Sequence, residues 1–145
     1  MCRRVLLMAA RTAVALCGLV VLLGCPSQLP RIAIDSPTGG TVGLTVTFRW
    51  HLETPGSRMP TSPGEIYRYE VRLDKGVNAC DRQIEQSFEA GSGSCLVVQL
   101  PSAIYDGQRV EFGIRATNSK GDVTCSTGNA FSVSAAVLPS APCGF

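Results

Sequence analysis

The sequence predicts an all-β protein, a seven-stranded antiparallel β-sandwich that follows an N-terminal signal peptide. Three observations lead to this prediction. Apolar and polar residues alternate with a period of two in several segments, and clusters of Gly, Pro, Asn and Asp separate these segments. After residue 24, no segment carries an apolar stripe at helical spacing. The first 24 residues differ in composition from everything after them, so they are set aside before the fold is considered.

The first 24 residues have the features of a secretion signal. An uninterrupted apolar run of eleven residues, Ala13 to Leu23, follows a basic region, and no acidic residue lies near it. The basic residues are Arg3, Arg4 and Arg11. A membrane-spanning helix needs about 20 apolar residues, and a longer span here would place Arg11 in the hydrocarbon. We therefore expect a signal peptide rather than a permanent membrane helix.

The apolar run ends in Leu22-Leu23-Gly24-Cys25, which resembles the lipobox of bacterial lipoproteins. The resemblance lies in the aliphatic residue at −3, the small residue at −1 and the cysteine; Leu23 departs from the Ala, Ser or Thr that is commoner there. It implies cleavage before Cys25 and a diacylglyceryl group on its sulfur. Two acyl chains make a stable membrane anchor. An ordinary secretory signal cut after Ser27 stays open as the alternative.

Removal of residues 1–24 leaves 121 residues, which is the size of one domain. This exported part has ten basic and eleven acidic residues and so a net charge of −1. Nucleic-acid binding requires a strongly basic surface, so this charge balance argues against a nucleic-acid partner. We divide the chain into a signal peptide at 1–24, a tether at 25–31, a sandwich at 32–136 and a Pro-containing tail at 137–145.

The strands are predicted in chain order from their alternation. The second, third and sixth strands have the clearest pattern, with apolar residues at every other position: Val46, Phe48, Trp50 and Leu52; Tyr67, Tyr69, Val71 and Leu73; Val110, Phe112, Ile114 and Ala116. The four weaker strands are 32–34, 87–90, 96–100 and 130–133. The residues between the apolar ones, such as Thr47, His51 and Arg72, are expected to face solvent.

Four cysteines remain for disulfides once Cys25 carries lipid: Cys80, Cys95, Cys125 and Cys143. An even number in an exported chain predicts two bridges. Three connectivities are open, and we favour the local pairs, Cys80 with Cys95 and Cys125 with Cys143. No C-x-x-C pair is present and His51 is the only histidine, so the pattern does not favour a zinc site.

Several short motifs resemble the fibronectin type III family over about residues 30–134. They are Trp50 in the second strand, Tyr67-x-Tyr69-x-Val71 in the third, Leu100-Pro101 before the sixth, and Ala116-x-Asn118-x-x-Gly121 at its exit. The family's corner tyrosine falls on Val110, and Tyr105 is out of register. An immunoglobulin domain would instead have its tryptophan in the third strand. The resemblance implies a sandwich that contacts protein or polysaccharide.

Catalytic chemistry is not indicated by the residues. A serine or cysteine hydrolase needs a histidine beside its nucleophile, and His51 is predicted on the wet face of its strand. No two carboxylates are marked as a pair, and no phosphate-binding, calcium or dinucleotide motif is present, so we expect no cofactor. Two surfaces stay open for binding: the Pro-rich loop Glu53 to Glu65, and the mixed charges facing outward from the third and sixth strands.

The sequence therefore favours a non-catalytic lipoprotein of the bacterial cell envelope, tethered to a membrane through Cys25. Its sandwich would bind a protein or polysaccharide, or act as a spacer. The alternative is an accessory domain of an extracellular hydrolase system.

Overall fold

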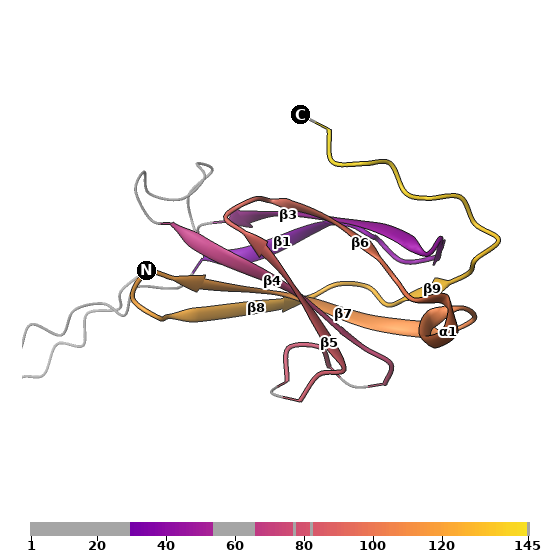
Figure 1. Ribbon diagram of the computed structural model, residues 1–145. Coiled ribbons are helices and arrows are strands. Elements are labelled where there is room, and N and C mark those ends of the chain that lie inside the picture. Colours follow the sequence, from indigo (N-terminus) through magenta and orange to yellow (C-terminus); the bar gives the residue numbers. More distant parts are fainter. Residues whose placement is uncertain (1–29, 54–65, 77, 82, 145) are drawn as a thin grey trace, which may run out of the picture.

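The computed structural model describes residues 30–53, 66–76, 78–81 and 83–144 (Figure 1). Cys25, the lipobox and most of the loop between Glu53 and Glu65 lie outside these residues. The described chain forms strands and one short helix, in the following order: β1 (Arg31–Ser36), β2 (Thr41–Val42), β3 (Thr45–Glu53), β4 (Tyr67–Asp74), β5 (Gln86–Gly91), β6 (Cys95–Gln99), α1 (Ser102–Tyr105), β7 (Arg109–Asn118), β8 (Val123–Thr127) and β9 (Phe131–Val133).

The strands form two sheets, so the predicted β-sandwich is confirmed. The smaller sheet has the order β1-β3-β6, and the larger has the order β2-β9-β7-β4-β5, with β8 also paired to β7 (Figure 1). All seven predicted strands are present. Two more occur among the described residues, the two-residue β2 and the five-residue β8. Within the same ranges, no helix is long and apolar enough to span a membrane.

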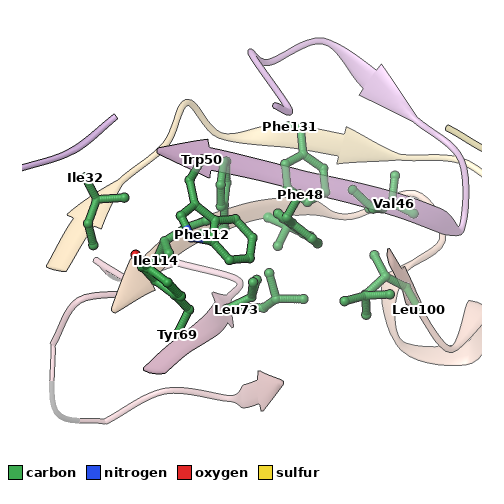
Figure 2. Packing of buried hydrophobic residues seen from close by; sticks show 14 of the residues in the cluster. Ile32, Val46, Phe48, Trp50, Tyr69, Leu73, Leu100, Phe112, Ile114 and Phe131 are labelled. Atoms are coloured by element: carbon green, nitrogen blue, oxygen red, sulfur yellow. The ribbon is translucent and has the colours of Figure 1, made fainter. Parts of the chain in front are cut away.

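The core between the sheets is built from the alternating apolar residues of β3, β4 and β7. Their side chains meet those of β1, β6 and β9 in one buried cluster (Figure 2). Aromatic rings provide much of the contact: the centroids of Phe48 and Phe112 are 5.2 Å apart, and those of Trp50 and Tyr69 are 5.4 Å apart. Such pairs contribute about 0.5–1.5 kcal/mol each beyond their burial. Trp50 and Tyr69 are therefore core residues rather than an exposed stacking platform.

Near its start, the described chain passes from the smaller sheet to the larger one between β1 and β2. β1 pairs with β3 in antiparallel register, whereas β2, after the cis peptide bond Ser36–Pro37, pairs with β9 in parallel register. Gly39 and Gly40 make the crossing with positive φ angles, a conformation that favours glycine. The chain therefore touches the edges of both sheets on the same side of the sandwich.

The predicted disulfide pairing is wrong. All four cysteines are bridged, but Cys80 pairs with Cys125 and Cys95 with Cys143. The side chain of Cys125 lies opposite Arg115 on the outer face of the larger sheet, and that of Cys95 lies opposite Arg49 on the outer face of the smaller sheet. Consecutive cysteines along the chain thus lie on opposite outer faces of the sandwich. Each cysteine can therefore bond only to the cysteine on its own face.

One disulfide fastens the C-terminal tail over the smaller sheet. The Ser140 amide donates to the Thr45 carbonyl (3.1 Å), the Thr47 hydroxyl donates to the Ala141 carbonyl (2.7 Å), and Cys143 follows. As a result Thr47, which was predicted to be exposed, is only 3% exposed. The segment from Ser140 to Cys143 is therefore held against the smaller sheet, whereas Leu138 is exposed.

The other disulfide fastens the loop between β4 and β5 over the larger sheet. Ala79 is fully buried there, and a Cβ on Gly113 would lie 3.0 Å from the Cys80 sulfur. Arg72 donates to the Cys80 carbonyl (3.3 Å) and is only 5% exposed, contrary to the prediction that its side chain faces solvent. Each outer face of the sandwich thus carries one disulfide-pinned cover.

Candidate binding groove between the edges of the two sheets

The edge of the larger sheet beyond β7 is formed by β8 and β9, and within the described residues only the β9 half of this edge pairs with a further strand. β8 and β9 both pair with β7 and form the two halves of this edge. On the β9 half, β2 adds as a parallel strand: the Ser132 amide donates to Gly40 (2.8 Å) and the Ser134 amide to Val42 (2.9 Å). On the β8 half, no strand of the described chain is paired at this side.

The direction of the backbone groups on β8 follows from its ladder with β7. The Gly128 amide donates to the Phe112 carbonyl (3.0 Å), and the register places Ser126 opposite Ile114. Backbone groups of successive residues point to opposite sides of a strand. The N–H and C=O groups of Thr127 therefore point away from β7, toward the open edge, and those of Cys125 do the same.

The edge of β1 that faces β8 also has backbone groups that do not bond to their own sheet. The Trp50 amide donates to Ser94, on the β6 side of β3 (3.1 Å), so the backbone groups of His51 point toward β1. His51 lies opposite Ala33. Ile32 and Ile34 therefore direct their N–H and C=O groups away from β3. Among the described residues, no backbone hydrogen bond joins β1 to β8.

A groove of about 360 Å³ lies along this seam between β1 and β8. Its walls are the residues of β1 from Arg31 to Ile34, the turn residues Pro37 and Thr38, Glu53, and the segment from Ser126 to Asn129. At the far end the seam is closed, because the side-chain Nδ2 of Asn129 donates to the Thr38 carbonyl (3.1 Å) just before β2 and β9 pair. The groove thus follows the half of the seam where β1 and β8 are not paired, whereas β2 and β9 pair along the other half.

A charged cluster lies beside the groove on the outer face of the smaller sheet. His51 Nδ1 is 3.0 Å from Asp35 Oδ2, and His51 Nε2 is 3.5 Å from Glu53 Oε1. The hydrogen bond to Asp35 is the main cause of a raised His51 pKa; the negative charges of both carboxylates add to the effect, and partial burial opposes it. His51 is exposed, as predicted, and it has two carboxylate partners.

The mixed charges predicted for the face of the third and sixth strands form a small ion-pair chain. Glu70 lies opposite Arg115 across β4 and β7, with Arg115 Nη1 3.7 Å from its carboxylate, and Arg72 Nε is 3.9 Å from the same carboxylate. The loop with Ala79 covers Arg72, so only part of this face stays open. Glu70 is occupied by two arginines, which makes the face a weak candidate for a ligand site.

No metal-binding cluster of His, Cys, Asp and Glu side chains occurs within the described ranges. The groove itself is lined by the apolar residues Ile32, Ile34 and Pro37 and by small, hydroxyl and amide residues, with one cation and one anion at one end. Sequence reasoning missed the groove because β8 has no period-two pattern; its β-branched residues, Val123, Thr124 and Thr127, were the signal for a strand.

The comparisons with known proteins give a likeness of fold. No family model matches the chain, and no curated protein matches it. A solved structure of a DUF3823 family protein from Bacteroides ovatus is similar, with a TM-score of 0.50 and 12% sequence identity. The match covers 70% of this chain and 54% of that protein, so this chain spans about half of its length. At this identity the likeness supports the β-sandwich fold alone.

Proposed function

We propose that the chain is a non-catalytic lipoprotein of the bacterial cell envelope, held at a membrane through lipid on Cys25. Its sandwich serves as a module that binds a protein or polysaccharide or acts as a spacer. The observation that carries the proposal is the break in composition that ends in Leu22-Leu23-Gly24-Cys25. An eleven-residue apolar run fits a cleaved signal better than a membrane span.

The two disulfides support an exported protein, because such bonds persist in oxidising compartments. The short tether supports a position close to the membrane. Only five residues separate Cys25 from Arg31, and six steps of an extended chain span roughly 20 Å. The start of β1, and with it one end of the groove, would then lie near the membrane surface.

The contacts of the only histidine support a non-catalytic module. Within the described part of the chain, the side-chain partners of His51 are two carboxylates, Asp35 and Glu53, and not a hydroxyl or thiol nucleophile. The groove offers backbone groups and small polar side chains, which suit recognition. We therefore assign the function to binding at the sandwich surface and to placement by the lipid.

Metabolic labelling with radioactive palmitate tests the anchor. The wild-type chain should take up label and stay with the membrane fraction, and Cys25→Ala should lose both. Cys17→Ala is the matched control, because it also removes a cysteine from the N-terminal segment; it should keep the label and the membrane location. A Cys25→Ala protein that remains labelled would overturn the proposal.

A further inference from the structure

We propose that the open edge of β8 accepts an extended peptide segment of a partner protein, which adds to the larger sheet as a further strand. The inference rests on the proposed binding role and narrows its partner to a protein with a short, uncharged, extended segment. Backbone hydrogen bonds supply the affinity in this type of recognition, and side-chain pockets supply the specificity.

The molecule already uses strand addition at the neighbouring half of the same edge. β2 pairs in parallel with β9 through the Ser132 and Ser134 amides, and this ladder stops where the groove begins. β1 does not extend it: among the described residues, no backbone hydrogen bond joins β1 to β8. Cys125 and Thr127 thus present N–H and C=O groups to a position that a strand from another chain can fill.

The edge of β8 also lacks the usual protection against pairing. Proteins guard exposed edge strands with charged side chains, proline or bulges. β1 has such features: its register shifts between Ile34 and Ser36, and Pro37 follows. β8 has the sequence Val-Thr-Cys-Ser-Thr, with no charge and no proline. The covers pinned by the two disulfides protect the outer faces of the sheets and leave this edge open.

The groove indicates the size and the charge of the segment. It follows β1 from Arg31 to Ile34, and four residues of extended chain span about 13 Å. Its two charged lining residues, Arg31 and Glu53, have opposite signs and lie at the same end, where the strand register places them opposite each other on β1 and β3. The remaining wall is neutral, so an uncharged segment of about four residues with small side chains fits it best.

The test uses the whole chain, extracted from membranes in detergent, and a phage-displayed pool of random heptapeptides as the probe. Thr127→Pro removes an N–H that β7 does not use, and Thr127→Ala is the matched control that keeps it. Loss of this one backbone hydrogen bond, together with the proline ring facing the incoming strand, should weaken binding of the selected peptides about tenfold in the proline variant, with little change in the alanine variant. Bound peptide should also slow hydrogen exchange at the Cys125 and Thr127 amides.

A second variant covers the case in which Thr127→Pro fails to fold. Ser126→Lys keeps the ladder to β7 and places a charge in the groove, so it should also weaken the selected peptides. Recovery of no binding peptide, or equal binding by wild-type protein and both variants, overturns the inference. So does a dimer that forms through this edge, since the occupant would then be a second copy. Palmitate labelling of Cys25 does not depend on Thr127, so failure here and failure of the anchor are distinguishable.

Discussion

Removal of the Cys95–Cys143 disulfide should release the C-terminal tail and destabilise the whole domain. The bond closes a loop of 48 residues, for which chain entropy alone gives a stabilisation of about 4 kcal/mol. The loop overlaps the one closed by Cys80 and Cys125, so the chain stays partly restrained in the unfolded state. We therefore expect Cys95→Ser with Cys143→Ser to lower the free energy of unfolding by about 2–4 kcal/mol.

Equilibrium urea unfolding of the oxidised proteins measures this loss, and hydrogen exchange follows the tail. The Ser140 amide, which donates to Thr45, should lose its protection in the double variant. Cys80→Ser with Cys125→Ser is the matched control: it opens a loop of similar length but should leave Ser140 protected. A loss below about 0.5 kcal/mol, or an unchanged Ser140 amide, would refute the role of the disulfide as the fastener of the tail.

Three further changes test the packing and the charges. A Cβ on Gly128 would lie 2.0 Å from Cζ of Phe112, so Gly128→Ala should cost about 1–3 kcal/mol or more in urea unfolding; wild-type stability would show that the ring can move aside. Burial is the main cause that raises the pKa of Tyr105 to about 12, and its buried hydroxyl has no hydrogen-bond partner within the described ranges. Tyr105→Phe should therefore be neutral or stabilising by up to about 1 kcal/mol, and a clear loss of stability would contradict this. Asp35→Asn should lower the raised His51 pKa toward 6.5 in an NMR titration. Because the folded-state pKa is raised, the stabilisation is complete below pH 6.5 and disappears as the pH rises through the folded-state value, and this pH dependence should shrink in the variant.

The strands of the core were predictable because burial between two sheets imposes a period of two. Phe48, Trp50 and Phe112 follow that period, and each is buried where the alternation places it. β8 was missed because its inward residues, Thr124 and Ser126, are small and polar at an open edge. An edge strand gives no strong pattern when little of it is buried.

Burial on the outer faces could not be predicted from alternation. The pattern identifies the side of the sheet on which Thr47 and Arg72 lie, but it carries no information about a segment that later folds over that side. The same limit explains the wrong disulfide pairing, because sequence distance does not show that Cys80 and Cys95 lie on opposite faces. These contacts join segments that are 45 and 48 residues apart through the bridges.

The candidate groove depends on a similar long-range relation. The residues of β1 and β8 that line it are distant in sequence, and neither strand has a catalytic or ligand-binding motif. The groove exists because β1 pairs with β3 and only β2 reaches β9. The signal for the anchor, by contrast, is local in sequence and needs no fold to be recognised.

The proposal of an anchored binding module depends first on Cys25, and mass spectrometry of the membrane-extracted protein tests it most directly. Digestion without reduction should give an N-terminal peptide that starts at Cys25 and carries a diacylglyceryl group on its sulfur. An N-terminus at any other residue, or an unmodified thiol on Cys25, would contradict the proposal.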